Sequence, residues 1–141
     1  MKIGCAGWSY DSWKKVFYPQ GLEKSDWLSY YAKYFDFVEV NSTFYNPLGP
    51  DTMKKWDEDT PKDFRFSVKM WQKVTHKYRD TDVTGNLDYF HRNLDPLRNK
   101  TSVVLTQFPP FFKKGTSTKT HLEKIVSHLE TNWDDGIVHA F

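Results

Sequence analysis

With 141 residues, of which 38% are hydrophobic and 27% charged, the chain has the length and composition of one globular domain that needs no disulfide or metal for stability. Twenty basic and eighteen acidic side chains leave a net charge of +2, so charge gives no support to nucleic-acid binding or to attraction by an anionic membrane. Aromatic residues make up 18% of the chain, well above ordinary usage, which predicts an aromatic-rich core or binding site.

The N-terminal part predicts a strand, a loop, a helix and a second strand. The apolar run 3–6 predicts a short strand, and the stretch 8–21, rich in aromatic residues, glycine and proline, predicts a long loop. Ser25 is expected to cap a helix, because apolar residues then recur at helical spacing as far as Phe35. Residues 37–41 are rich in β-branched and aromatic residues, which predicts the second strand.

The middle of the chain repeats this order. Asp51 is expected to cap a short helix, which must end before Pro61 because proline disfavours helical geometry in the residue preceding it. Apolar and polar residues alternate over 64–68 and predict the third strand. The apolar spacing of residues 87–97 predicts a further helix, despite Pro96 near its end.

The C-terminal part predicts one more unit and the start of another. Residues 103–105 predict the fourth strand, and Thr120 with Glu123 forms the sequence pattern of a capping box. An apolar stripe follows as far as Leu129 and predicts a helix, and residues 137–138 predict the beginning of a fifth strand.

Strands that alternate with helices predict an α/β protein with a parallel sheet and right-handed connections. The unit recurs about every 30 to 35 residues, which is the size of one βαβ step. An open doubly wound sheet and a closed barrel both fit this spacing. No glycine-rich phosphate-binding loop follows the first strand, which argues against a dinucleotide-binding open sheet.

Several short blocks, taken in order, are more specific than the spacing. Their residues are GCAGWSY at 4–10, Trp13, FYP at 17–19, VEVNSTFY at 38–45, Trp56, TP at 60–61, FRFSVK at 64–69, TH at 75–76 and LTQFPPF at 105–111. These blocks resemble the signature stretches of the YecE-like family, domain of unknown function 72. The resemblance runs through the whole chain.

The resemblance implies a TIM-barrel fold and a family of unknown activity. It also implies that a family member continues after Phe141 with three more strand–helix units. We therefore expect residues 1–141 to form one partial domain, the first half of a (β/α)8 barrel with about four strand–helix units and the start of a fifth strand. Such a half leaves open sheet edges and an apolar interior. We expect a homodimer, or a second chain, to complete the barrel; a truncated, catalytically silent half-barrel is the alternative.

In TIM barrels, functional residues lie at the C-terminal ends of the strands and in the loops that follow. By that position, the candidate catalytic residues are Glu39, Lys69 and His76. The candidate ligand-binding residues are Trp8, Ser9, Tyr10, Asn41, Thr43, Tyr45 and Gln107. We predict no metal site and no cofactor, because few potential ligands lie near the predicted rim.

Glu39 lies inside an apolar strand, where a carboxylate needs a partner. Lys69 at the end of the third strand is the expected partner. The pair can act as a general base beside an anion-binding lysine, or as a structural ion pair inside a barrel. Asn41 and Gln107 can orient a ligand or satisfy loop backbone groups, and His76 is either an acid or base or an exposed, idle histidine.

Two functions fit these residues. The first is a pocket for a small polar ligand, phosphorylated or sugar-like, with hydrolase- or lyase-type chemistry. The second is a nucleic-acid-binding module, in which aromatic loops contact bases and lysines contact phosphates. The aromatic residues concerned, which alternatively form a packed loop core, are Trp8, Tyr10, Trp13, Tyr18, Phe44 and Tyr45. The lysines are Lys14, Lys15, Lys54, Lys55, Lys73 and Lys77.

Cys5 is the only cysteine, so the chain has no internal disulfide and no cysteine-based zinc site. In an apolar strand it is expected to be a buried small residue rather than a nucleophile. The chain begins without a secretion leader pattern, and no apolar run approaches the roughly 20 residues needed to cross a bilayer. We therefore expect a cytoplasmic protein that does not enter the membrane.

Overall fold

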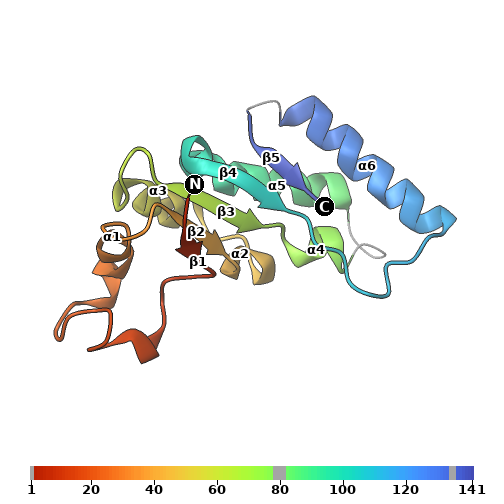
Figure 1. Ribbon diagram of the computed structural model, residues 1–141. Helices are drawn as coiled ribbons and strands as arrows, with labels where there is room; N and C mark the ends of the chain where they lie inside the picture. Colours follow the sequence, from red (N-terminus) through yellow and green to blue (C-terminus); the bar gives the residue numbers. More distant parts are fainter. Residues whose placement is uncertain (1, 78–81, 134–135) are drawn as a thin grey trace.

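The computed structural model describes residues 2–77, 82–133 and 136–141. Its five strands form one parallel sheet in the order β1-β2-β3-β4-β5, so each strand pairs with the next one in the chain. Figure 1 shows this sheet with α3 and α5 behind it, and α6 beside β5. The prediction of an α/β fold with a parallel sheet is confirmed, since strands joined by helical crossovers on one side give this arrangement.

All five predicted strands are present within a residue or two of their expected bounds. They are β1 (Gly4–Cys5), β2 (Phe37–Val40), β3 (Arg65–Lys69), β4 (Thr101–Leu105) and β5 (Val138–Ala140). The two-residue β1 lies against β2 so closely that a β-carbon at Gly4 would collide with the carbonyl of Phe37. Tyr31 also connects them: its hydroxyl accepts from the Cys5 amide at 2.7 Å and donates to the Phe37 carbonyl at 3.0 Å.

The helices differ more from expectation than the strands do. The α-helices are α1 (Trp27–Tyr31), α2 (Ser42–Tyr45), α3 (Pro50–Glu58), α4 (Gln72–Thr75), α5 (Val83–Leu94) and α6 (Thr116–Asn132). Three 3-10 helices accompany them: η1 (Asp11–Trp13), η2 (Lys24–Asp26) and η3 (Asp95–Lys100). None of the described helices is long and apolar enough to cross a membrane.

Several predicted helix boundaries are wrong. The N-caps of α1, α3 and α6 are Asp26, Gly49 and Gly115, so Ser25 and Asp51 are not caps. The Thr120–Glu123 pattern lies inside α6, which begins earlier, after Gly115, and has no side-chain cap. The helix expected over 87–97 ends at Leu94 and continues as η3, where proline cannot donate an amide hydrogen bond.

Alternation along the strands divides their side chains between two faces. Val38 pairs with Phe66, and Val68 pairs with both Val40 and Val104. These five side chains are almost completely buried on the face that the helices cover. Residues one position along point to the opposite face, because side chains in a strand alternate. That second face has no helix over it in Figure 1.

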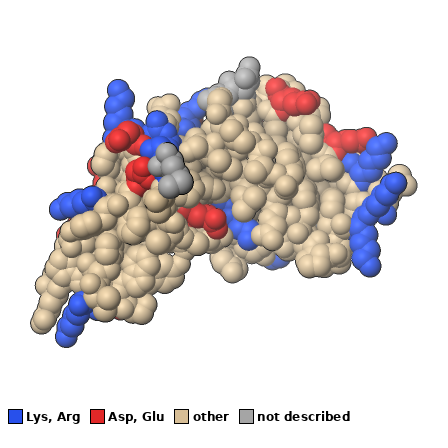
Figure 2. Space-filling model, viewed as in Figure 1, with Lys and Arg blue, Asp and Glu red and all other residues tan. Residues whose placement is uncertain are grey.

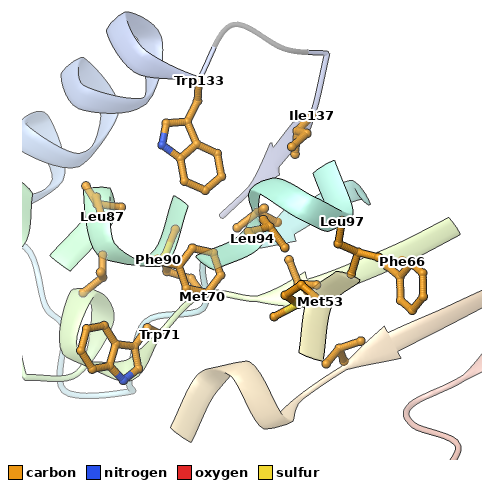
Figure 3. Packing of buried hydrophobic residues seen from close by; sticks show 14 of the residues in the cluster. Met53, Phe66, Met70, Trp71, Leu87, Phe90, Leu94, Leu97, Trp133 and Ile137 are labelled. Atoms are coloured by element: carbon orange, nitrogen blue, oxygen red, sulfur yellow. The ribbon is translucent and has the colours of Figure 1, made fainter. Parts of the chain in front are cut away.

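The core lies between the sheet and the helices. Figure 3 shows Trp133, just after α6, pointing toward Phe90 and Leu94 of α5, with Met53 and Phe66 farther from Trp133 in the same cluster. The rings of Phe90 and Trp133 are stacked, with centroids 6.1 Å apart. Burial of these large side chains fixes α3, α5 and α6 on one face of the sheet.

The buried Lys100 side chain stabilises the C-terminal end of α3 through hydrogen bonds and an ion pair. Lys100 Nζ donates to the Thr60 carbonyl at 2.8 Å and pairs with Asp57 Oδ1 at 3.1 Å. A positive charge at a helix C-terminus interacts favourably with the carbonyl groups there. Lys100 therefore has a structural role at the N-terminal edge of the sheet, away from the strand ends that carry the candidate site.

Candidate functional site

The C-terminal ends of β2 and β3 bring several predicted site residues together. Lys69 is the last residue of β3, and the short helices α2 and α4 follow β2 and β3 within a few residues. Sequence analysis did not predict either helix. Because neighbouring parallel strands end at the same edge of a sheet, α2 and α4 lie at one rim. Gln72 Nε2 donates to the Tyr45 carbonyl at 3.3 Å and joins them directly.

On the face without helices, three polar residues follow one another across β2 and β3. Glu39 pairs with Ser67 in the sheet register, and Lys69 pairs with Leu105 of β4. Glu39 and Lys69 are therefore diagonal neighbours on the same face, with Ser67 between them. Figure 2 shows the same side of the molecule: an acidic and a basic surface adjoin near the middle, over β2 and β3.

The partner of Glu39 is Asn41, the residue that directly follows β2. Asn41 Nδ2 donates to Glu39 Oε1 at 2.8 Å, which holds the carboxylate beside the end of β2. No ion pair joins Glu39 to Lys69, although the structure describes both residues, so the expected pairing is not formed. Glu39 is only half-buried, which lets water and the Asn41 amide satisfy its charge without a lysine.

Lys69 instead lies against an aromatic ring. Its ammonium group is 4.8 Å from the centroid of the Phe44 ring in α2, a cation–π contact. Among the described residues it makes no ion pair with a carboxylate. The ammonium group therefore keeps hydrogen-bond donors for another acceptor at the strand ends.

His76 lies next to the same aromatic ring. Its ring centroid is 4.9 Å from that of Phe44, and its Nδ1 is 2.8 Å from the Thr75 hydroxyl. Burial, and secondarily the positive charge of Lys69, lowers the pKa of His76 below its ordinary value. The imidazole is therefore neutral near pH 7 and can accept a proton.

The lowered pKa of His76 predicts a pH dependence of stability. The unfolded chain takes up a proton near the ordinary pKa of 6.5, whereas the folded protein takes it up only at lower pH. The stabilising contribution is complete above about pH 7.5 and is lost as the pH falls through the unfolded pKa toward the folded one. Between about pH 7.5 and pH 5, wild type should lose more unfolding free energy than His76→Gln in urea titrations.

His121 provides an internal reference for that comparison. Its pKa is lowered as well, mainly by burial, and its Nε2 lies 2.7 Å from the Val74 carbonyl. Because both proteins contain His121, its contribution cancels in the difference between them. Equal pH slopes for wild type and His76→Gln would show that His76 is not held neutral by the fold.

Thr43 and Tyr45 have different positions at this rim. The Thr43 hydroxyl lies 2.7 Å from the Lys69 carbonyl and 3.3 Å from the Val40 carbonyl. Thr43 is fully buried, so its side chain positions α2 against β3. Tyr45 is largely exposed and its ring meets that of Phe44 edge to face, which leaves the phenol available at the surface.

Trp8, Ser9 and Tyr10 lie apart from this cluster. The ring of Trp8 meets Trp56 of α3 at 5.0 Å, and Trp56 stacks on Phe66, on the face that the helices cover. Tyr10 donates its hydroxyl to the Ala6 carbonyl, and Ser9 is exposed. No described contact joins these three residues to Glu39 or Lys69.

The six aromatic residues predicted to contact bases or to form a packed loop core are thus divided between two places. Tyr18 stacks on Trp27 with ring centroids 4.4 Å apart, and Trp13 packs against Tyr10 and Tyr18. These residues form a packed loop core, whereas the half-buried Trp8 packs against Trp56 of α3. Phe44 and Tyr45 alone lie beside Lys69 and His76.

Gln107 and Ser67 are two further polar residues at this edge of the sheet. Gln107 is exposed and lies two residues beyond Leu105, which pairs with Lys69, so it extends the same face past β4. Ser67 was not among the predicted site residues, although it is buried directly opposite Glu39. The alternation of polar Arg65, Ser67 and Lys69 along β3 was the signal that could have identified it.

Cys5 and potential metal ligands add little to this site. Cys5 is half-buried and packs against the main core cluster. Within residues 2–77, 82–133 and 136–141, no group of three or more His, Cys, Asp or Glu could hold a metal ion.

Comparison with known proteins places this arrangement in a family. A family model described as a protein of unknown function, DUF72, matches residues 2–140. UPF0759 protein YunF of Bacillus subtilis is 33% identical to the chain and aligns with 78% of the chain and 40% of its own length. UPF0759 protein YecE of Escherichia coli is 28% identical, over 78% of the chain and 38% of its own length.

Solved structures agree with the fold. A DUF72 family protein of Thermotoga maritima superposes with a TM-score of 0.75 at 32% identity, over 90% of this chain and 51% of that protein. A second one, from Enterococcus faecalis, superposes with a TM-score of 0.73 at 18% identity and supports the fold alone. The chain spans about 40% of the length of these curated relatives and about half of these solved structures.

Proposed function

The chain belongs to the DUF72 family of proteins of unknown function, and we propose that it binds a small polar ligand with an anionic group at the ends of β2 and β3. A phosphorylated sugar or similar metabolite fits this chemistry, with a hydrolase- or lyase-type reaction. Family membership supports no particular activity, so the proposal depends on the residues of the site.

The observation that carries the proposal is the state of Lys69. Its ammonium group lies over Phe44, without a carboxylate partner among the described residues, at the edge where Glu39 and His76 also lie. A lysine held by an aromatic ring keeps its charge and its donors for a ligand. Phosphate and carboxylate groups are the ligand parts that best accept such donors.

Residues near Lys69 can hydrogen-bond to the other parts of the ligand or remove a proton from it. Glu39, oriented by Asn41 at 2.8 Å, is placed to accept a ligand hydroxyl or to remove a proton. Neutral His76 is a second base, and Ser67 and Gln107 can hydrogen-bond hydroxyl or carbonyl groups. In this arrangement Lys69 binds the anion, and Glu39 or His76 acts on the adjacent carbon or water.

We also propose that the five strands form the first part of a (β/α)8 barrel. The parallel order of the strands, the rim of loops at their C-terminal ends and the greater length of the relatives support this proposal. A cytoplasmic location is proposed as well, supported by a single cysteine, which suits a reducing compartment.

The nucleic-acid alternative loses support from the same contacts. Lys14 pairs with Asp11 at 2.9 Å and Lys55 with Asp59 at 2.8 Å, while Lys54 lies 3.8 Å from Glu58. Trp8 packs against the core and Tyr18 is buried, so these two of the six proposed base-contacting rings are not available for stacking. The contacts therefore reduce the basic and aromatic surface on which single-strand binding depends.

A thermal-shift panel tests the proposal. Sugar phosphates should raise Tm by several degrees at concentrations about a hundredfold above Kd, because binding at that level adds about 2.7 kcal/mol of stability. The unphosphorylated sugars should have little effect, since they lack the anion that Lys69 binds. A shift with single-stranded DNA alone would favour the alternative, and no shift with any compound would favour a catalytically silent chain.

A further inference from the structure

Lys69 and His76 share one aromatic ring at the ends of the strands. The Lys69 ammonium group lies 4.8 Å from the centroid of the Phe44 ring, and the centroid of the His76 ring lies 4.9 Å from it. Both side chains are half-buried, so each still reaches solvent in part. β3, which ends at Lys69, has β2 on one side and β4 on the other, so elements of this chain hold both groups in place.

The two ring nitrogens of His76 have different surroundings. Nδ1 lies 2.8 Å from the hydroxyl of Thr75, which is fully buried. A hydroxyl can donate to a bare ring nitrogen or accept from a protonated one, so this contact suits both the neutral and the charged imidazole. Among the described residues Nε2 makes no hydrogen bond, and it is therefore available to a ligand.

Lys69 is the charged group that acts on His76. Burial comes first in lowering the pKa of His76, and the positive charge of Lys69 comes second. Other titratable groups lie on the surrounding elements: Tyr45 of α2, Glu39 of β2, and Lys73 and Lys77 on and just after α4. A change in the net charge at Lys69 therefore acts directly on the protonation of His76.

The charge of the bound anion decides the direction of that change. A carboxylate has one negative charge and cancels the charge of Lys69. A phosphate monoester has nearly two negative charges at neutral pH, so a net negative charge remains after it pairs with one ammonium group. That remaining charge attracts a proton to the nearest basic group, and His76 beside the same Phe44 ring is placed to receive it.

We infer that the anion site at Lys69 selects a dianion, a phosphate monoester, and that His76 takes up a proton from solvent when this ligand binds. The inference rests on the proposed function. His76 Nε2 then donates to the phosphate, and Nδ1 donates to the Thr75 hydroxyl. Two positive charges on the protein balance the two negative charges of the ligand. A protonated His76 cannot act as a base, which leaves Glu39 as the base of the site.

Calorimetric titration with glucose 6-phosphate at pH 7, in two buffers with different heats of ionisation, measures the proton uptake. The phosphate is already mostly dianionic at this pH, so the uptake reports on the protein. We expect roughly half a proton per bound ligand, because a nearby opposite charge raises a histidine pKa by about one to three units. The imidazole resonances of His76 in NMR spectra should titrate at higher pH with the ligand than without it.

Two histidine variants provide the matched comparison. His76→Gln should abolish the proton uptake and weaken glucose 6-phosphate binding about tenfold, since it removes a hydrogen bond from a charged donor. Binding of gluconate, a monoanion, should weaken less than about threefold. His128→Gln changes a histidine of α6 that pairs with Asp88 at 3.0 Å, and should leave uptake and affinity unchanged. Circular dichroism verifies that both variants fold.

The outcomes separate this inference from the proposed function. If wild type does not bind glucose 6-phosphate, both are wrong. Binding without proton uptake, or uptake that persists in His76→Gln, would overturn the inference and leave the anion site at Lys69 in place. Equal affinity of wild type for gluconate and glucose 6-phosphate would overturn the selectivity for a dianion.

Discussion

Replacement of Phe66 by alanine is expected to lower the free energy of unfolding by about 3–5 kcal/mol. The Phe66 side chain has no exposed surface, and its ring lies against Trp56 and Phe64 with centroid distances of 6.2 and 5.0 Å. It is in the central strand of the sheet, where Val38 and Thr101 are its register partners. Little around it can move to fill the cavity, so the loss approaches the upper part of this range.

Phe111→Ala is the matched control for this variant. It removes the same side chain from the loop before α6, where Phe111 is 60% exposed. Equilibrium urea denaturation should show a loss of about 0.5 kcal/mol or less for Phe111→Ala. Similar losses for the two variants would contradict the assignment of Phe66 to the core between the sheet and the helices.

Substitution of Lys69 by methionine should weaken the binding of a sugar phosphate by about a hundredfold, since a hydrogen bond to a charged group contributes about 1.5–3 kcal/mol. Methionine keeps much of the length of lysine and its contact with Phe44, but it removes the charge. Stability should change little, because Lys69 is only half-buried and makes no ion pair among the described residues. Isothermal titration calorimetry with each phosphate identified in the thermal-shift panel measures the effect.

Lys33→Met is the control for Lys69→Met. Lys33 is another lysine over an aromatic ring, 5.6 Å from the centroid of Tyr30. It is more exposed than Lys69 and lies just after α1, away from the C-terminal ends of the strands. The Lys33→Met variant should bind the sugar phosphate with the same affinity as wild type. Equal weakening by both variants would mean that net charge, rather than the position of Lys69, determines affinity.

The strands could be predicted from the sequence because burial on the sheet imposes a local pattern. Apolar side chains alternate with polar ones or lie together in residues 37–40 and 65–69. This pattern predicts the ends of β2 and β3 to within one or two residues. Helix ends were harder to predict. α6 begins after Gly115 without a side-chain cap, although Thr120 and Glu123 form the sequence pattern of a capping box farther along the chain.

The site was predictable in part, for a related reason. Position at the end of a strand identified Glu39 and Lys69, and the parallel register places them on one face. Their contacts could not be predicted, because Asn41 and Phe44 intervene through side-chain geometry that sequence spacing does not determine. Trp8 and Tyr10 follow a strand as well, but the long loop after β1 folds them onto an aromatic core instead.

An NMR titration of the 15N-labelled chain with glucose 6-phosphate tests the proposed site most directly. The proposal predicts that the largest amide shift changes fall in residues 39–46 and 67–77, around Glu39, Phe44, Lys69 and His76. Changes confined to the lysine-rich segment 113–119 before and within the start of α6, or no changes at millimolar ligand, would contradict it.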